Sequence, residues 1–585
     1  MPFSLVDADS LLSIDVGTIS TRAALFDVVE GRYRYIASGQ AASTAGVPYR
    51  DISEGVRQAI ESLEALTGRV LLNESHQLIL PSTQGFGIDA VAATYSAGPA
   101  LKTVVVGLLN DVSLESLQRL ARSTYARVVD TIGMNDTRPV EEQIDSLVRN
   151  SPDLVLIAGG TDEGATRSVQ LLLETVGLAC HLLPAEKLPA VLYAGNRRLS
   201  EQVRSSLQPL TSSLAVSANL HPTLEVEDLQ PAQYALAGLY NQIRRMQMNG
   251  VDELNNWAGN TLVPTAYAEG RIIRFLSQGY DPGKGLLGVD LGASAATLAA
   301  GFNGSLAMGV YPQLGMGDGL AGLLRYTNLE DITRWLTLEI PDESVREYIQ
   351  NKALFPATLP ATQEELSIEH AIARQNLLIG LNSLAKDFPR SARRMAPGLT
   401  PFFEPILASG STLTRAPGVA QTLLILLDAI QPVGITTIVT DPNSLLPGLG
   451  AAASRNALLP VQVLESGAFQ LLATVIAPHT AARAGTPVLR ARLVLANGNE
   501  SRAEIKQGSL ELLPLVPGQS GRLYLQLLHG ADVGFGPGRT PKDGLPVSGT
   551  ALGLVFDARG RPLRLPADGG RRRELLKKWQ QGLGG

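Results

Sequence analysis

The chain has 585 residues and a net charge of −6; 45% of its residues are apolar and 18% are charged. This composition excludes an intrinsically disordered chain, which has fewer apolar residues and a larger net charge. It also provides no excess of positive charge for binding nucleic acid. The length favours three or four domains, and the 58 glycines show no collagen-like period.

A single cysteine, Cys180, excludes an internal disulfide and a cysteine-based metal cluster. We therefore expect a reducing compartment, the cytoplasm. The first residues lack the basic and apolar regions of a signal peptide, and no apolar run of about 18 residues predicts a transmembrane helix. The six histidines show no metal-ligand spacing.

Strand and helix patterns alternate along the chain, which predicts an α/β fold. Residues 11–16 predict a buried strand that ends in a Gly-Thr turn, residues 22–29 a second strand, and residues 51–66 an amphipathic helix. From residue 101, four strand–helix units follow one another. They predict a separate, Rossmann-like α/β domain over residues 101–225.

Residues 231–280 and 325–400 predict mostly helices, and residues 285–302 between them predict a strand, a turn and a second strand. After about residue 485, short alternating strands separated by Gly, Asn and Pro predict a β-rich module. The last residues, GGRRRELLKKWQQGLGG, predict a basic amphipathic helix. Such a helix could contact an acidic partner or a membrane surface, or could simply close the fold.

An internal repeat relates two of these segments at an offset of 275 residues. LLSIDVGT (11–18) aligns with LLGVDLGA (286–293), each a buried strand that ends in Asp, an apolar residue and a small-residue turn. A carboxylate at the end of a buried strand needs a partner, and Mg²⁺ is one such partner. The glycine lets the backbone approach a phosphate, whose oxygens the N–H groups of the turn can bind. One copy alone favours a β-hairpin with a capped turn, whereas two copies at matched strand positions favour a nucleotide site.

Three segments resemble the first phosphate, second phosphate and adenosine motifs of the actin, sugar-kinase and heat-shock-chaperone ATPase superfamily: DVGTIST (15–21), DLGASAAT (290–297) and LASGSTLTRAPG (407–418). The resemblance implies a two-lobed actin-like ATPase fold that binds ATP and Mg²⁺. It implies that Asp15 holds Mg²⁺ through water and that Asp290 orients the attacking water or the metal. The nucleotide-binding residues it implies are Gly17, Thr18 and Thr21 at one phosphate face, Gly292, Ala293 and Ser294 at the other, and Gly410 and Ser411 at the adenosine.

The chain departs from the superfamily pattern at three points. Ala293 stands where a second glycine is common, Ala408 stands where a glycine often precedes the Ser-Gly-Ser turn, and no lysine lies near any of the motifs. Phosphoryl transfer depends on positioning and charge neutralisation, so a missing cation matters more for hydrolysis than for binding. We therefore expect ATP binding with slow hydrolysis.

Other segments resemble the glutamate mutase L family, the MutL-type proteins unrelated to mismatch repair. They include LVLIAGGTDEGA (154–165), VLYAGNRR (191–198), LNNWAGNTLVPTAYAEGRIIRF (254–275) and KQGSLELLPLVPGQSGRL (506–523). The resemblance covers nearly the whole chain. It implies an ATP-dependent accessory or reactivating chaperone whose partner is adenosylcobalamin-dependent glutamate mutase or a similar enzyme. An actin-like scaffold or filament, and a small-molecule kinase, remain alternatives because one fold hosts all three.

A second candidate site follows two strands of the 101–225 domain. Its residues are Gly159, Gly160, Thr161 and Asp162 after one strand and Gly195 and Asn196 after the next. Parallel sheets bind ligands at the carboxyl ends of their strands, so these turns could form one pocket. The alternative is a tight strand-to-helix turn in which Asp162 or Thr166 caps the helix.

These patterns together predict an α/β protein in five parts: the first ATPase lobe (1–100), the inserted α/β domain (101–225), the second part of the ATPase core (226–485), a β-rich module (486–570) and a basic C-terminal helix (571–585).

Overall fold

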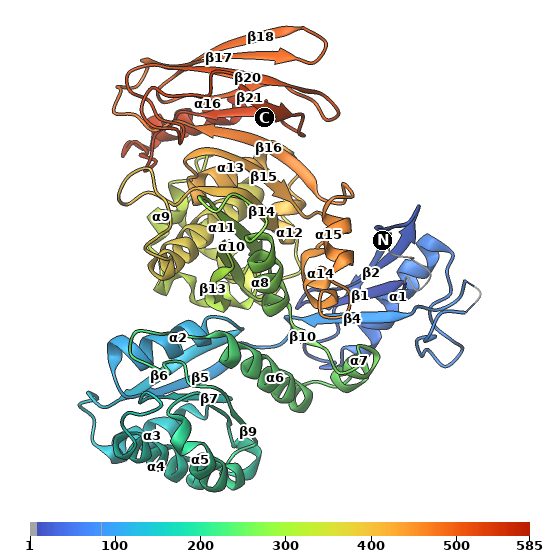
Figure 1. The fold of residues 1–585 in the computed structure, drawn as a ribbon, viewed down its shortest axis with the longest axis vertical. Helices are drawn as coiled ribbons and strands as arrows, with labels where there is room; N and C mark the ends of the chain where they lie inside the picture. The colour runs from blue at the N-terminus through green and yellow to red at the C-terminus, as the bar shows by residue number, and fades with distance from the viewer. Residues whose placement is uncertain (1–8, 84, 585) are drawn as a thin grey trace. The chain divides into compact units, whose positions relative to one another are not determined.

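The computed structural model describes residues 9–83 and 85–584. The chain forms two compact units, and strands alternate with helices in both (Figure 1). The first unit comprises Met1–Ala268, Met308–Pro312 and Pro447–Gln462, and the second comprises Glu269–Ala307, Gln313–Leu446 and Val463–Gly585. The α/β class expected from the sequence is confirmed. This division is coarser than the five expected parts, whose boundaries stay predictions.

The first sheet of the first unit has the strand order β3-β2-β1-β4-β10. β1, β2 and β3 form an antiparallel meander, and β4 and β10 continue the sheet in parallel on the other side of β1. Helix α1 packs on β2 and β3. The strands are β1 (Leu11–Val16), β2 (Ser20–Val29), β3 (Arg32–Ala42), β4 (Ala90–Tyr95) and β10 (Val263–Pro264); the helices are α1 (Ser53–Thr67), α6 (Gln230–Gln247), α7 (Val251–Trp257) and α8 (Thr265–Leu276), which begins in this unit.

The second sheet of the first unit is entirely parallel, with the order β6-β5-β7-β8-β9. Figure 1 shows α2 on one face of this sheet and α3, α4 and α5 on the other. Alternate strand residues such as Val155 and Ile157 pack with Val169 of α4 and Val203 of α5 in one core. The elements are β5 (Leu101–Gly107), β6 (Ala126–Gly133), β7 (Leu154–Ala158), β8 (Ala190–Tyr193), β9 (Ser213–Val216), α2 (Glu115–Ala121), α3 (Val140–Asn150), α4 (Arg167–Leu182) and α5 (Ser200–Leu207).

The second unit is built on an eight-stranded sheet with the order β13-β12-β11-β14-β15-β16-β22-β19. Its first five strands repeat the order of the first unit's sheet, with β11, β12 and β13 in the places of β1, β2 and β3. The strands are β11 (Gly285–Leu291), β12 (Ala296–Phe302), β13 (Ser305–Tyr311), β14 (Phe403–Ser409), β15 (Gly434–Thr440), β16 (Gln470–Ala477), β19 (Leu510–Leu513) and β22 (Leu554–Asp557); the division into units falls within β13, after Ala307.

A buried cluster of charges joins the helices of this unit to β22. Arg559 pairs with Asp557 at 2.8 Å and with Asp428 at 2.6 Å, and Arg374 pairs with Asp428 at 2.7 Å. Burial alone would raise the pKa of Asp557, but Arg559 and Arg561 hold it well below its usual range. The helices are α9 (Leu329–Thr333), α10 (Asp342–Leu354), α11 (Gln363–Leu384), α12 (Ser411–Thr414) and α13 (Val419–Ile430). Two further helices, α14 (Leu446–Ala452) and α15 (Leu458–Leu464), lie mostly in the first unit.

The C-terminal strands divide between two sheets. β17 (Pro487–Leu495), β18 (Glu500–Lys506), β20 (Ser520–Leu527) and β21 (Leu545–Ser548) form a separate four-stranded sheet, whereas β19 and β22 extend the large one. The two sheets share a core that contains Ile476 and Phe556 of the large sheet and Leu489 and Leu523 of the small one. The expected C-terminal helix forms as α16 (Gly569–Gly582), whose Trp579 Nε1 donates to the Gly508 carbonyl at 2.9 Å.

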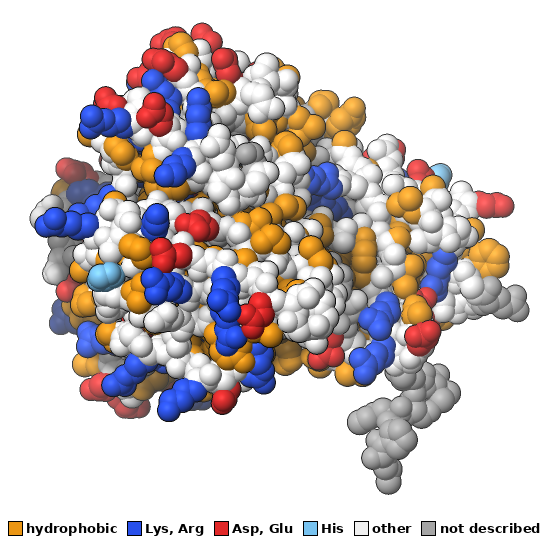
Figure 2. Space-filling model, turned by 90° about the horizontal axis from the view of Figure 1, so that it is seen from above, with side chains coloured by type: hydrophobic (Ala, Val, Ile, Leu, Met, Phe, Trp, Pro, Cys, Tyr) orange, Lys and Arg blue, Asp and Glu red, His pale blue; other side chains and the backbone are white. Residues whose placement is uncertain are grey.

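No helix among the described residues is both long and apolar enough to cross a bilayer. On the face drawn in Figure 2, Lys and Arg side chains are interspersed with Asp and Glu side chains. Cys180 is buried, and burial raises the pKa of its thiol to about 11, which makes it a poor nucleophile.

Candidate functional site

The first copy of the repeat places Asp15 at the end of the central strand β1. Asp15 is opposite Arg22 on β2 and beside Thr94 on β4. Its Oδ1 accepts hydrogen bonds from Thr94 Oγ1 at 2.7 Å and from Thr265 Oγ1 at 2.8 Å. Asp15 Oδ2 has no hydrogen-bond partner among the described residues, so one oxygen of a nearly buried carboxylate remains available.

The turn after Asp15 joins β1 to β2. The Gly17 amide donates to the Ser20 carbonyl at 3.0 Å, which closes a four-residue turn. A side chain at Gly17 would place its Cβ 2.9 Å from that carbonyl oxygen, so the turn favours glycine here. Thr18 lies half-buried in the turn, and its Oγ1 is buried without a partner among the described residues. The turn therefore carries a hydroxyl whose hydrogen-bonding capacity the described part of the protein does not use.

Thr21 and Arg22 point to opposite faces of the sheet, because neighbouring residues of a strand alternate. Thr21 pairs with Val16, and its fully buried Oγ1 lies on the side of α1, near Gly55. The sequence predicted Thr21 as a phosphate contact, but the structure does not bring it to the face of Asp15. Arg22 is on that face, since directly opposed residues of antiparallel strands share a side. It is half-buried and makes no hydrogen bond or ion pair with a described residue.

The second copy repeats this geometry around Asp290. Asp290 is opposite Thr297 on β12 and beside Ser409 on β14. The Gly292 amide donates to the Ala295 carbonyl at 3.0 Å, the same turn hydrogen bond as in the first copy. Ala293 and Ser294 occupy the half-buried tip of the turn. Thr297 Oγ1 is buried and has no partner among the residues described.

The third motif lies directly against Asp290. Gly410 has φ +89°, and a Cβ there would be 2.3 Å from the Leu291 carbonyl oxygen and 2.7 Å from Asp290 Oδ1. Only glycine fits such a backbone position without displacing its neighbours. Ser411 is exposed at the start of the short helix α12. The structure thus brings the predicted second phosphate and adenosine motifs together within one unit.

A glycine-rich loop that the sequence analysis did not single out supports the second turn. Met316 donates its amide to the Gly292 carbonyl at 2.9 Å. Side chains at Gly315 or Gly317 would collide with the Ala293 carbonyl oxygen, at 2.5 and 2.8 Å. The run GMGDG (315–319) was the available signal, because closely spaced glycines mark places where the backbone approaches another group. Arg22, Thr94 and Thr265 were also missed.

The donor set around Asp15 fits a hydrated Mg²⁺ ion rather than a metal held by a protein cage. Among the described residues, no group of three or more His, Cys, Asp or Glu side chains could hold a metal. Mg²⁺ keeps several waters and needs only one or two carboxylates together with phosphate oxygens. The nearly buried Asp15 carboxylate, with one unengaged oxygen, meets the requirement for one carboxylate.

The second candidate site forms the carboxyl edge of β7 and β8, as expected for a parallel sheet. Asp162 Oδ1 accepts from the Arg197 amide at 3.2 Å and from Asn219 Nδ2 at 3.0 Å. In the Asn196 side chain, Nδ2 donates to the Gly164 carbonyl at 3.3 Å and Oδ1 accepts from the Arg198 amide at 3.0 Å. The loops therefore engage the polar groups of Asp162 and Asn196 themselves. Thr166 stands at the N-cap of α4 but makes no side-chain capping bond, and neither does Asp162.

The remaining predicted residues lie in the same two loops, Gly159, Gly160 and Thr161 after β7 and Gly195 after β8. Gly160 has φ +69°, and a Cβ there would be 2.5 Å from the Ala165 carbonyl oxygen. A Cβ at Gly195 would be 3.0 Å from the Gly159 amide and carbonyl. Gly160 is thus explained by the tight turn of its own loop, and Gly195 by the close approach of the two loops. Thr161 lies in the same turn, close to Gly164.

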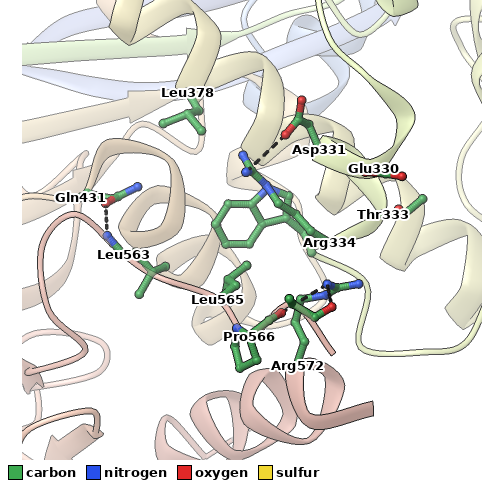
Figure 3. A pocket seen from close by; sticks show the side chains of 12 residues that line it. Glu330, Asp331, Thr333, Arg334, Leu378, Gln431, Leu563, Leu565, Pro566 and Arg572 are labelled. Carbon is green, nitrogen blue, oxygen red and sulfur yellow. Dashed lines mark hydrogen bonds and ion pairs between the residues drawn. The ribbon is translucent and has the colours of Figure 1, made fainter. Parts of the chain in front are cut away.

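Two cavities in the second unit lie away from the predicted residues. The larger, of about 660 Å³, is walled by α9, Arg334, Gln431 and the segment that leads into α16 (Figure 3). Its ion pair between Arg334 and Asp331, at 3.3 Å, keeps those charges engaged within the protein. The smaller, of about 280 Å³, borders the buried charge cluster at Asp428 and Arg559. None of the residues predicted from the motifs lines either cavity.

Comparison with known proteins gives a family and several distant structural likenesses. Residues 11–467 match the family described as MutL protein. Protein MutL of Clostridium tetanomorphum is 24% identical over 249 residues, which are 41% of this chain and 52% of that protein, so the match spans about half of the relative's length. The diol dehydratase-reactivating factor in nucleotide-free form is 10% identical, with a TM-score of 0.28 over 78% of this chain and 99% of that one. Nucleotide-free acetone carboxylase is 12% identical, with a TM-score of 0.28 over 86% and 81% of the two chains.

Proposed function

The chain belongs to the MutL protein family, the group that its motifs resemble, and we propose that it binds ATP and Mg²⁺ at the turns that follow Asp15 and Asp290. The proposed architecture is an actin-like ATPase fold. The single observation that carries the proposal is the repeated geometry of the two motifs. Both turns share the same hydrogen bond, the same register and the same strand order in their sheets.

In this proposal, the first motif binds phosphate and metal. Asp15 holds the hydrated metal through Oδ2, and Gly17 and Thr18 meet phosphate oxygens through the turn amides and the Thr18 hydroxyl. Arg22 supplies a positive charge on the same face, which compensates for the absence of a lysine near the motifs. Bound Mg²⁺ would neutralise phosphate charge, which is the main requirement of phosphoryl transfer.

In the same proposal, the second motif offers phosphate contacts of the same kind. Asp290 orients water at the terminal phosphate, and Gly292, Ala293 and Ser294 present the turn amides. Gly410 and Ser411 adjoin the adenosine, the role that the resemblance of their motif implies, and Gly410 is packed against Asp290. Hydrolysis is slow, because the turn carries Ala293 where a second glycine would leave more room for phosphate.

We further propose that nucleotide binding regulates a protein partner, an adenosylcobalamin-dependent mutase such as glutamate mutase. Family membership supports this partner, and the proposed role is that of an accessory or reactivating chaperone. ATP would act by changing the conformation of the chain, a common output of nucleotide-dependent proteins.

Isothermal titration of the purified chain with Mg-ATP tests the nucleotide site. We expect binding in the micromolar range that is lost in both Asp15→Ala and Asp290→Ala. Unchanged affinity in both variants contradicts the proposal. Capture of purified glutamate mutase with and without ATP tests the partner, and Asp15→Ala is the control that should not bind nucleotide. If the mutase is captured in neither condition, the proposed partner is wrong, but the proposed nucleotide site is not affected.

A further inference from the structure

Two threonine hydroxyls converge on one oxygen of Asp15. Thr94 Oγ1 and Thr265 Oγ1 lie 2.7 and 2.8 Å from Asp15 Oδ1, and both side chains are buried. An ionised carboxylate only accepts hydrogen bonds, so both hydroxyls donate to it. Both lone-pair directions of Oδ1 are thereby used by the protein.

The two donors reach Asp15 from independent parts of the first unit. Thr94 is the parallel-strand neighbour of Asp15 on β4. Thr265 follows β10 and is the first residue of α8, 250 residues away from Asp15 in the sequence. β10 pairs with β4 at Thr94 itself, which fixes the start of α8 relative to β1.

Close packing holds the start of α8 in place. A Cβ at Gly450 of α14 would lie 2.0 Å from the carbonyl oxygen of Ala268, so the two helices meet backbone to backbone. Gly448 in the same helix approaches Ser13, which shares the face of Asp15, and a Cβ there would be 2.0 Å from Ser13 Oγ. Close packing of the start of α8 therefore holds the Thr265 hydroxyl in position to donate to Asp15.

We infer that Thr94 and Thr265 are positioning residues, which hold the carboxylate of Asp15 by Oδ1 so that Oδ2 is left for the hydrated Mg²⁺ of the bound nucleotide. This inference rests on the proposed function. A carboxylate fixed in advance loses less rotational freedom when the metal binds, which strengthens binding. In the second motif, Ser409 takes the register position of Thr94.

The test compares Thr94→Val and Thr265→Val, which remove the hydroxyl at nearly constant volume, with Thr94→Ser and Thr265→Ser, which keep it. Thr103→Val is the matched control, because Thr103 is equally buried and its hydroxyl donates to the Leu101 carbonyl instead. ATP affinity is measured by isothermal titration in Mg²⁺ and again in EDTA. We expect each Val variant to bind about tenfold more weakly in Mg²⁺, the loss of a hydrogen bond to a charged group, and to match the wild type in EDTA.

The Ser variants and Thr103→Val should keep the wild-type affinity in both buffers. Val variants that keep the wild-type response to Mg²⁺, or that lose affinity equally in EDTA, overturn the positioning role. A wild-type chain whose ATP binding ignores Mg²⁺ overturns the proposed metal site and this role together. If Thr94→Val does not fold, Thr265→Val decides the question, because Thr265 lies at a helix start outside the sheet core.

Discussion

Asp15 and Asp290 hold the same position in two copies of one motif. Each is the next-to-last residue of an interior strand, each is followed two residues later by a glycine whose amide closes a turn at 3.0 Å, and each has a hydroxyl-bearing neighbour on the next parallel strand. The two copies differ in the residue opposite the carboxylate, which is Arg22 in the first and Thr297 in the second. The first copy therefore places a positive charge opposite its carboxylate.

Removal of the cation opposite Asp15 should weaken nucleotide binding. We predict that Arg22→Gln lowers ATP affinity about tenfold and reduces its dependence on salt, because a positive charge near phosphate acts through a field that salt screens. The measurement is titration with Mg-ATP at low and high ionic strength. Arg32→Gln is the control, since Arg32 is exposed on β3 and the change in net charge is the same. Equal affinities for the two variants would show that Arg22 does not face the phosphates.

The tight contact at Gly410 should not tolerate a methyl group. We predict that Gly410→Ala abolishes most ATP binding, because its Cβ would push against the Leu291 carbonyl and the Asp290 carboxylate. Gly485→Ala separates this effect from backbone strain: Gly485 has φ +85° but nothing within 4 Å of the added Cβ. The strain of a positive φ costs about 1 kcal/mol at either site. If both variants bind ATP like the wild type, Gly410 has no role in shaping the second motif.

Acid should destabilise the second unit through His370. Burial, assisted by Arg374, lowers the pKa of this imidazole from 6.5 to about 3. Between these values the unfolded chain binds the proton and the folded chain does not, so stability falls as the pH falls. When the pH falls from about 7.5 to about 5.5, we expect His370 to lower the free energy of unfolding by about 1 kcal/mol.

Urea unfolding of the wild type and His370→Gln at the two pH values measures this contribution. The variant should show a smaller acid-induced shift of the unfolding midpoint. His181→Gln is the control, because His181 is exposed near the end of α4. The same shift in wild type and His370→Gln would mean that other groups govern the response.

The sequence was sufficient for features that depend on local patterns. The buried runs LLSIDV and LLGVDL form β1 and the core of β11, and the Asp-x-Gly turns form at the expected positions. Strand–helix alternation likewise predicted the parallel sheet of residues 101–216, because each unit carries its own hydrophobic period.

Features that depend on long-range pairing could not be predicted in this way. Thr265 becomes a partner of Asp15 only because β10 adds to the edge of β4, and two residues of strand give almost no sequence signal. The motif predicts that Thr21 contacts a phosphate, whereas the alternation of side chains along β2 turns Thr21 toward α1. The alternating pattern places β19 and β22 in one C-terminal module, but β22 pairs with β16, which lies outside the predicted bounds of that module, and β19 pairs with β22.

Hydrogen–deuterium exchange with and without Mg-ATP tests the central claim most directly. We predict slower exchange of the amides in two peptides, one covering residues 17–21 and the other residues 292–296, and little change in β18, which is far from both in the sequence and serves as the internal reference. Protection of neither peptide at saturating Mg-ATP, or protection confined to other segments, would contradict the assignment of the repeated turns as the nucleotide site.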